Sequence, residues 1–262
     1  MLPTRDPSGS HIFMHRSAAT LVLALAACGV ASEAMSQSFE IRALDIEKGG
    51  IDIELNNAVF SGRAGNSGNR SGHEQVFSYG VTNWWRLAAA VDWDNPVGDD
   101  LRATNLGIEN IFLLRPMKQK QDIGLGLFVA LEPAIHNEST NAFVFGPIVT
   151  VKWDKLLWTF NPFLEQTFGR NREEGIALDY GWQAKYELRE GLAVGVEGYG
   201  LVESLGDPPP WSEQQHRIGP VLYTEVEVAK NIKIAPSIGV LFGLTPATAD
   251  VALRFNVDIH LH

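Results

Sequence analysis

Apolar and polar residues alternate one by one along most of the chain from residue 51 onward. Between Ile176 and Leu188 every second residue is apolar or aromatic, and the positions between them include Asp179, Gln183 and Lys185. This period of two is typical of a β-strand whose two faces meet different surroundings, and no segment keeps a helical period. The alternation predicts twelve strands, within residues 51–59, 74–81, 86–93, 105–114, 123–132, 142–153, 158–168, 176–188, 192–199, 217–226, 232–242 and 251–262.

The lengths of these strands and of their connections favour a transmembrane barrel over a soluble sandwich. Most strands approach or exceed the roughly 9–11 residues that a tilted strand needs to cross a bilayer, whereas strands of globular proteins cluster near about 5–6. Short and long connections alternate, as in an up-and-down barrel with tight turns at one end. The short connections are 82–84, 116–121, 154–155, 189–190 and 229–230, and the long ones are 61–72, 95–103, 133–141, 169–175, 203–215 and 243–250.

Tryptophan residues gather at the ends of the predicted strands, where an outer-membrane barrel has its aromatic girdles. Examples are Trp84, Trp93 and Trp158. We therefore expect an all-β fold, a single up-and-down antiparallel transmembrane β-barrel of about twelve strands over residues 50–262, with both termini periplasmic.

Four prolines fall inside predicted strands, although a proline removes one hydrogen-bond donor from the ladder. They are Pro147, Pro162, Pro220 and Pro236. Bulges or local kinks of the barrel would accommodate them.

The first 36 residues have the pattern of an export signal. Met14-His15-Arg16 precede the short apolar run Ala18–Ser32, and small residues follow it. We expect residues 1–36 to hold an N-terminal overhang and a Sec signal peptide cleaved after Ser36, and residues 37–49 to form a short periplasmic segment. Leu25-Ala26-Ala27-Cys28 also resembles a lipobox with Cys28 as the acylated residue, but we favour Cys28 as part of the apolar run that leaves with the signal. The expected location is the outer membrane of a Gram-negative bacterium.

Composition removes several classes of function. The net charge of −10 argues against nucleic-acid binding, which needs a basic surface. Without Cys28 the exported chain has no cysteine, which excludes disulfides, thiolate metal sites and a cysteine nucleophile. No phosphate loop, zinc spacing or haem motif occurs, so we expect no cofactor and no metal site. The expected partners are outer-membrane lipid, the barrel assembly machinery and small solutes.

An enzyme is a competing class, because some twelve-stranded outer-membrane barrels are phospholipases with a His/Ser pair on the lipid-facing surface. No outward histidine or serine is predicted here; the outward polar residues inside the strands are chiefly Gln75, Asn110, Gln166 and Thr224. Two His/Ser combinations share loops, His136 with Ser139 and Ser212 with His216, which is common among solvated turn residues. We therefore expect the protein not to be an enzyme.

If the apolar strand faces meet lipid, the polar faces line the lumen. The candidate lumen-lining residues are Asp92, Glu109, Glu132, Glu165, Asp179, Lys185, Glu197, Arg217, Glu225 and Arg254. Acids outnumber bases about two to one on the inward faces, which favours a channel for small cationic or neutral solutes. The alternative is a non-conducting structural or surface barrel whose inward charges pair in salt bridges, and a lipid-modifying enzyme is the third hypothesis.

Several stretches resemble a family of proteobacterial outer-membrane barrels. They are FSYGVTNWWRLAAAVDW, FGPIVTVKWDKLLWTFNPFLEQTFG, LDYGWQAKYEL and WSEQQHRIGPVLY, and the likeness extends over roughly Ile51 to His262. Members of this family are usually described as transport proteins or as relatives of proteins encoded in phenol meta-degradation clusters. The resemblance implies an outer-membrane barrel and transport. One departure is the C-terminus, VDIHLH, which lacks the final aromatic residue that the barrel assembly machinery usually reads.

Overall fold

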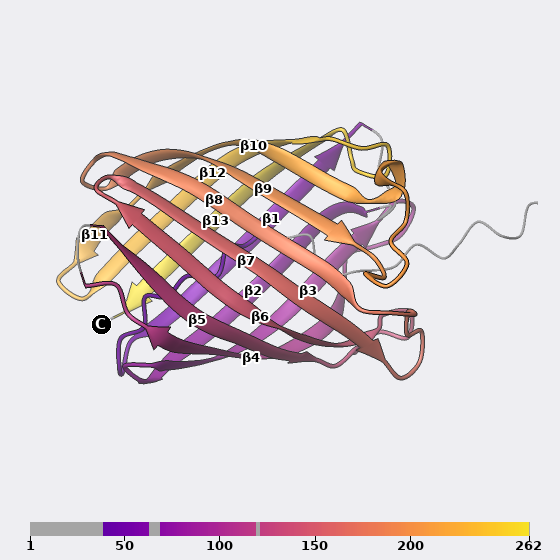
Figure 1. The fold of residues 1–262 in the computed structure, drawn as a ribbon, viewed down its shortest axis with the longest axis horizontal. Helices are drawn as coiled ribbons and strands as arrows, with labels where there is room; N and C mark the ends of the chain where they lie inside the picture. Colours follow the sequence, from indigo (N-terminus) through magenta and orange to yellow (C-terminus); the bar gives the residue numbers. More distant parts are fainter. Residues whose placement is uncertain (1–38, 63–68, 119–120, 262) are drawn as a thin grey trace, which may run out of the picture. The chain divides into compact units, whose positions relative to one another are not determined.

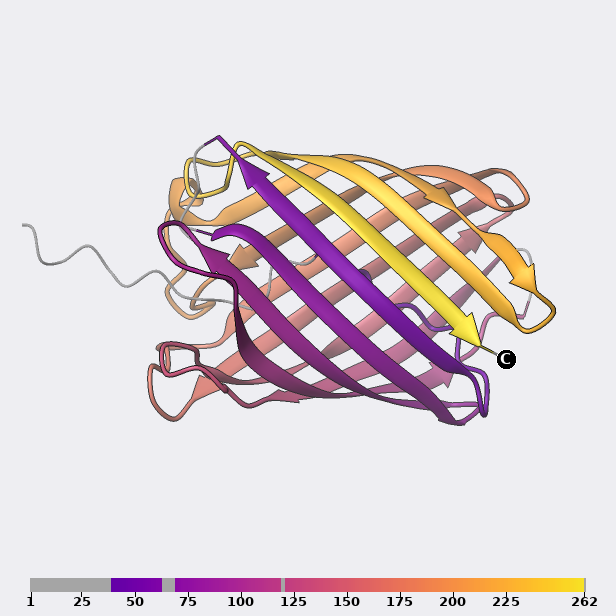
Figure 2. The same ribbon diagram turned by 180° about the vertical axis from the view of Figure 1, so that it is seen from behind.

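The computed structural model describes residues 39–62, 69–118 and 121–261. The strands form one antiparallel sheet that closes on itself, because β1 pairs with β13 and β10 pairs with β12 (Figure 1; Figure 2). In chain order they are β1 (Ile51–Ser61), β2 (Asn69–Thr82), β3 (Trp85–Pro96), β4 (Arg102–Arg115), β5 (Gln121–Glu132), β6 (Asn141–Trp153), β7 (Leu156–Phe168), β8 (Ala177–Arg189), β9 (Leu192–Val202), β10 (Gln215–Thr224), β11 (Val226–Ala229), β12 (Ile232–Gly243) and β13 (Val251–Leu261). One 3-10 helix, η1 (Trp211–Glu213), precedes β10, and the described residues contain no α-helix.

The barrel wall has twelve strand positions, which confirms the predicted all-β barrel. β10 and β11 are separated only at Glu225 and share one position in the wall, since both pair with β12. Neighbouring strands are antiparallel and follow one another in sequence, so the topology is up-and-down. Each of the twelve predicted segments overlaps one wall position.

The alternation of residues along each strand corresponds to the inner and outer faces of the wall. In β6, Phe143 and Phe145 are 40% and 37% exposed on the outside, whereas Val144 between them is fully buried on the inside. The same outer exposure of large apolar residues recurs around the barrel, for example at Phe77 and Trp158. An apolar outer surface of this kind is what a lipid-facing barrel requires.

The strand prolines lie at interruptions of the hydrogen-bond ladder. Pro147 and Pro162 stand opposite each other in a gap of the β6–β7 pairing, and the pairing resumes beyond the gap in the same register. Pro220 lies in a similar gap between β10 and β12, and Pro236 lies beside Thr224, whose hydroxyl donates to the Pro236 carbonyl at 3.0 Å. No β-bulge occurs at these gaps. Each proline lacks its backbone N–H at a position where one neighbouring strand forms no ladder pair with it.

The two ends of the barrel differ, as the connection lengths predict. The turn end carries the short connections and the end of β13, and the loop end carries the long connections, including η1 (left and right in Figure 1). Among the described residues no helix is long and apolar enough to cross a membrane. The predicted signal peptide, its cleavage after Ser36 and Cys28 lie outside the described residues.

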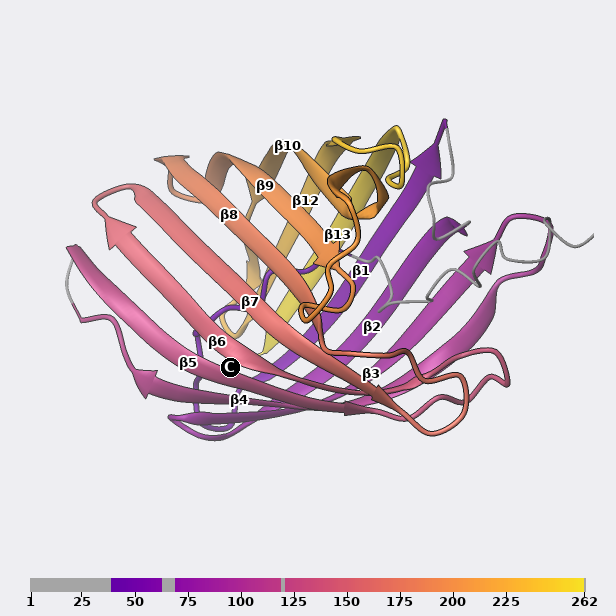
Figure 3. The ribbon, with the colours of Figure 1, turned by 45° about the vertical axis from the view of Figure 1, so that its right-hand side comes forward.

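Residues 39–50, which we call the inner segment, run inside the barrel and enter β1 at the turn end (Figure 3). Phe39 packs on Tyr199 of β9, and Leu44 belongs to a buried apolar cluster with Phe128 of β5. Gly49 donates its N–H to the Gly80 carbonyl of β2 at 2.7 Å. The sequence predicts a short periplasmic segment over residues 37–49 and no contact between it and the barrel. In the structure, residues 39–49 contact residues of several strands from inside the barrel.

Candidate functional site in the barrel lumen

The structure places most of the predicted lumen-lining residues in buried positions inside the wall. Seven of them are buried: Asp92, Glu109, Glu132, Glu165, Glu197, Arg217 and Arg254. Asp179 and Lys185 are half-buried, and Glu225 is exposed at the break between β10 and β11, where it pairs with Lys233 at 3.4 Å.

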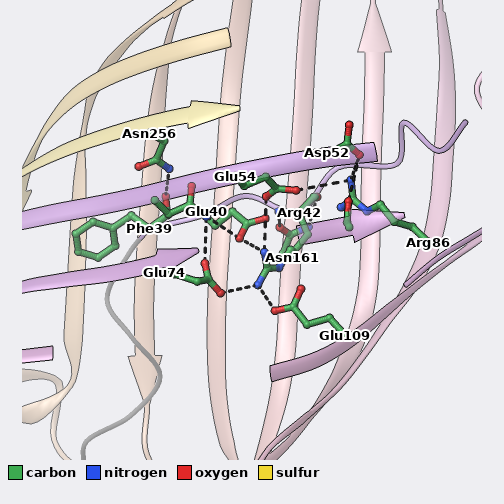
Figure 4. Close-up of polar contacts among 12 residues, drawn as sticks. Phe39, Glu40, Arg42, Asp52, Glu54, Glu74, Arg86, Glu109, Asn161 and Asn256 are labelled. Atoms are coloured by element: carbon green, nitrogen blue, oxygen red, sulfur yellow. Dashed lines mark hydrogen bonds and ion pairs between the residues drawn. The ribbon is translucent and has the colours of Figure 1, made fainter. Parts of the chain in front are cut away.

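The centre of the lumen is organised by Arg42 of the inner segment (Figure 4). Its guanidinium donates to Glu109 of β4 at 2.6 Å and to Glu74 of β2 at 3.0 Å, and it also pairs with Glu40. Arg42 is only 4% exposed, and burying a charge is favourable only when it is paired and hydrogen-bonded. The inner segment therefore supplies the cation that the inward carboxylates of the wall lack.

Asn161 of β7 holds the backbone of the inner segment beside Arg42. The Arg42 N–H donates to the Asn161 side-chain oxygen at 2.8 Å, and the Asn161 amide donates to the Arg42 carbonyl at 3.2 Å. Asn161 is 1% exposed, so this pair satisfies groups that would otherwise be buried without partners.

Glycines of β5 leave room for Leu44 against an apolar part of the wall. A Cβ at Gly126 would lie 2.4 Å from a Leu44 methyl carbon, and one at Gly124 would lie 3.1 Å from another. Phe128 and Phe163, with ring centroids 4.7 Å apart, form the same buried cluster. The inward face of β5 to β7 is thus apolar where Leu44 contacts it and polar at Asn161, where it binds the backbone of Arg42.

Phe39 anchors the other described end of the inner segment. The Phe39 carbonyl accepts a hydrogen bond from the Asn256 amide at 3.1 Å, and the Tyr199 hydroxyl, whose proton the carbonyl shares with Glu197, lies 3.2 Å from it. The Arg217 guanidinium lies over the Phe39 ring, 4.5 Å from its centroid, and Phe60 packs edge-on against that ring. Contacts to β1, β9, β10 and β13 thus fix this residue across a wide part of the wall.

A second polar network lies on β9, β10, β12 and β13. Glu197, 1% exposed, accepts hydrogen bonds from the hydroxyls of Tyr199 and Tyr223 at 2.7 Å each and from Arg254 at 3.1 Å. Arg254 also donates to the Ser237 hydroxyl at 3.1 Å. The Glu197 carboxylate thus has three donors, and the network links neighbouring strands, while the Arg254 Nε is buried without a hydrogen-bond partner among the described residues.

Four inward carboxylates near the loop end have no cationic partner within the described residues. They are Asp92, Glu132, Glu165 and Asp179, and no ion pair joins any of them to a described lysine, arginine or histidine. One carboxylate oxygen of Glu165 is buried without a hydrogen-bond partner. No cluster of three or more histidine, cysteine, aspartate and glutamate residues suited to a metal ion occurs in the described part of the chain.

A cavity of about 440 Å³ remains open at the turn end, between the inner segment and the wall. Polar and charged residues from opposite sides of the barrel line it, among them Lys152, Lys185 and Asp258. Leu157 and Leu192 contribute apolar surface. Lys185 and Glu225 were predicted to line the lumen, and both line this cavity. The sequence did not predict that residues of the inner segment also line it, namely Glu40, Ile41, Ala43 and Asp45.

The two loop combinations named for the enzyme hypothesis form no nucleophile–base pair among the described residues, but β2 carries a serine–histidine pair that was not predicted from the sequence. The His73 ring hydrogen-bonds to the Ser71 hydroxyl at 2.9 Å and to the Asn57 side-chain oxygen at 2.8 Å. Ser71 and His73 share the outward face of β2 with Phe77, so the prediction of no outward histidine or serine is wrong at these positions.

His216 is buried, stacks on Trp211 with ring centroids 4.0 Å apart, and hydrogen-bonds to Tyr180 at 2.8 Å and Gln214 at 2.9 Å. No hydrogen bond joins His136 or His216 to a serine hydroxyl in the described part of the chain.

The loop end also carries a carboxyl group outside the strands with a shifted ionisation. Burial raises the pKa of Glu203, in the connection before β10, and the carboxylates of Glu173 and Glu213 raise that pKa further. Glu203 therefore holds its proton to higher pH than an ordinary glutamate does.

A closed twelve-stranded barrel with an apolar outside and a charged inside defines the class of fold, and comparisons with known proteins agree. No protein-family model and no curated protein matches the chain. The fold is similar to that of the COG4313 outer membrane channel from Pseudomonas putida F1, with 10% identity over 85% of this chain and 99% of that chain and a TM-score of 0.59. It has a weaker likeness to the KdgM porin in complex with disordered oligogalacturonate, with 14% identity over 81% of this chain and 98% of that chain and a TM-score of 0.48. The NanC porin matches with 11% identity over 81% of this chain and 99% of that chain and a TM-score of 0.48. At these identities the likeness concerns the fold alone, and the relation to phenol meta-degradation proteins stays a prediction.

Proposed function

We propose that the protein is an outer-membrane channel for small solutes, with a lumen narrowed by the inner segment. The observation that carries the proposal is a charged, partly open lumen inside a barrel whose outer surface is apolar. Such a wall separates a polar path from lipid. The fold likeness to an outer membrane channel supports the same function.

The charges of the lumen favour cationic or neutral solutes in this proposal. Arg42 neutralises part of the carboxylate surplus at the centre, but Asp92, Glu132 and Glu165 keep no ion pair among the described residues. Inward carboxylates along a pore attract cations and repel anions. Export by a Sec signal, assembly into the outer membrane of a Gram-negative bacterium, and periplasmic termini belong to the same proposal.

A non-conducting structural barrel is the second candidate. The network from Arg42 to Glu74 and Glu109, together with the hydrogen bonds of Asn161, favours it, because these contacts cross the lumen. Both candidates share the fold and differ in whether water and ions pass the inner segment.

Conductance in planar lipid bilayers distinguishes them. The mature chain should conduct and should show a reversal potential that favours cations in a salt gradient. A variant lacking residues 39–46 should conduct more, and heat-unfolded protein serves as the control for detergent artefacts. A folded wild-type barrel that stays silent at high protein load contradicts the channel, and conduction by the deletion variant alone then supports the closed structural barrel.

A further inference from the structure

Opposite walls of the turn-end cavity carry charges of opposite sign. In the closed ring of strands β6, β7 and β8 lie across the barrel from β13 and β1. Lys152 of β6 and Lys185 of β8 line the cavity on one side. Glu54 of β1 and Asp258 of β13 line it on the other, and these two are direct partners in the strand register.

The two lysines have no carboxylate partner among the described residues. Lys152 on β6 and Lys185 on β8 both lie opposite Leu157 of β7, the strand between them. Two strand spacings therefore separate the backbones of the two lysines, about 10 Å. The Lys185 ammonium lies over the Tyr223 ring, 4.9 Å from its centroid, a contact that leaves its positive charge uncompensated. This side of the cavity therefore presents two lysines without an ion pair to any described residue, with Glu187 on the same face of β8 as Lys185 nearer the rim.

Asp258 and Asp45 are the corresponding carboxylates on the far side. No ion pair joins either of them to a cation within the described residues, and both line the cavity. Other charges that line the cavity have partners. Arg254 pairs with Glu197 at 3.1 Å, and Arg86 lies 3.8 Å from Asp52 and 4.0 Å from Glu54. Glu40 pairs with Arg42, Glu225 with Lys233 at 3.4 Å, and His260, on the same face of β13 as Asp258, with Asp52 at 2.8 Å. Asp154, Lys155, Glu187 and Glu190 belong to the turns and strand ends at the rim and carry both signs.

Apolar groups also line the cavity. Leu157, Leu192, Ala193 and Pro236 line the cavity together with Ile41 of the inner segment. Its volume of about 440 Å³ is within the range of roughly 300–1,000 Å³ that small-molecule sites occupy.

We propose that this cavity binds a small zwitterion with a short aliphatic body. Its carboxylate would contact Lys152 and Lys185, and its ammonium group would contact Asp258 and Asp45. A solute with one charge satisfies only one wall, whereas a zwitterion satisfies both and places its hydrocarbon against the leucines. The assignment names a solute class for the lumen and thus rests on the proposed function as a channel.

Calorimetry with the full mature barrel in detergent tests the site with three probes of equal chain length. They are 6-aminohexanoate, which carries both charges, hexanoate, which carries only the anion, and hexylamine, which carries only the cation. We expect 6-aminohexanoate to bind about tenfold more tightly than either single-charge probe, as one added charge contact of about 1.4 kcal/mol gives. Lys185→Gln should bring its affinity down to that of hexylamine, and Asp258→Asn should bring it down to that of hexanoate.

Two matched variants control for the loss of one charge away from the cavity. Lys118→Gln lies in the connection between β4 and β5, and Asp207→Asn lies in the connection before β10. Neither should change the binding of any probe. Retained mobility of the unheated barrel on a denaturing gel shows for each variant that the protein is folded.

Equal binding of hexanoate and 6-aminohexanoate overturns the proposal, and so does an absence of binding by all three probes at millimolar concentration. Unchanged affinity in both Lys185→Gln and Asp258→Asn also overturns it. The binding measurement requires no conduction. A silent barrel that still binds the zwitterion removes the channel and leaves the site, whereas a conducting barrel without binding removes the site and leaves the channel.

Discussion

Replacing Arg42 by glutamine should release the inner segment while the barrel wall stays folded. The substitution removes the cation that Glu74 and Glu109 share, and both carboxylate side chains are less than one-tenth exposed. The strand pairings of the wall do not involve residues 39–48, so the loss acts on the segment and not on the ladder. Arg42→Gln is therefore a local perturbation of the lumen.

The cost follows from the burial of the group. Removing one partner of a buried ion pair costs about 3–5 kcal/mol, and we take about 2 kcal/mol here because the turn-end cavity admits water to the neighbouring carboxylates. Since each 1.4 kcal/mol is a factor of ten, about 2 kcal/mol raises the population of the released segment about thirty-fold. Arg42→Lys keeps the charge but loses the two-pronged donor geometry, so its effect should be intermediate.

Hydrogen exchange followed by mass spectrometry measures this population. Peptides covering residues 40–46 should exchange about thirty-fold faster in Arg42→Gln, while peptides from β1 keep the wild-type rate. Arg102→Gln is the matched control, because Arg102 also pairs with two carboxylates, Asp99 at 2.6 Å and Glu138 at 2.8 Å, but does so at the loop end. Exchange of residues 40–46 at the wild-type rate in Arg42→Gln would refute the role given to Arg42.

Three further substitutions test other contacts. Gly126→Ala adds a Cβ 2.4 Å from Leu44, so it should displace the inner segment and raise the exchange of residues 40–46, whereas unchanged exchange would show that the wall yields instead. Glu197→Gln removes the charge shared by Arg254 and two tyrosines, so it should destabilise the barrel by about 2–4 kcal/mol, read as a lower temperature at which the folded gel mobility is lost; an unchanged temperature would contradict the network. Glu203→Gln should raise the temperature at which the folded gel mobility is lost when the pH is above about 5, and should leave it unchanged at lower pH. The raised pKa of Glu203 means that the folded state favours the protonated carboxyl and is destabilised as the carboxyl ionises. An equal effect at all pH values would exclude ionisation as the cause.

The fold was predictable from the sequence because each strand must present one face to lipid and the other to the lumen. From Phe143 to Val151, apolar residues at every second position predict the outward face, and in β6 these positions are more exposed than the ones between them. The split of the strand at Glu225 was not predictable, since the apolar positions Leu222 and Val226 continue the pattern across it.

The inner segment was not predictable in the same way. The apolar residues Phe39 and Ile41 stand at odd positions, and Leu44 and Ile46 stand at even positions. Residues 39–46 therefore lack the period of two that predicts a strand. Two signals nevertheless point to a chain inside the lumen: the inward glycines 124 and 126 of β5 and the surplus of inward carboxylates. A glycine with an empty Cβ position often marks the close approach of another backbone or side chain, and unpaired carboxylates need a cation that the wall does not provide.

The carboxylates that Arg42 does not reach carry the last prediction, that Glu165→Gln lowers the preference of the channel for cations. Glu165 is 5% exposed and one of its oxygens has no hydrogen-bond partner, so it holds either a cation from solution or a proton. Only an ionised Glu165 attracts permeating cations, and the substitution removes that charge while keeping the shape of the side chain.

The reversal potential of Glu165→Gln in a salt gradient distinguishes these two states. A shift toward zero shows that Glu165 is ionised and faces the conducting path. Glu138→Gln is the control, because Glu138 is a glutamate of the loop end that lies outside the strands and is 67% exposed. An unchanged reversal potential in Glu165→Gln means that this carboxyl is protonated or lies off the path, and the acid surplus near the loop end then cannot be the source of cation preference.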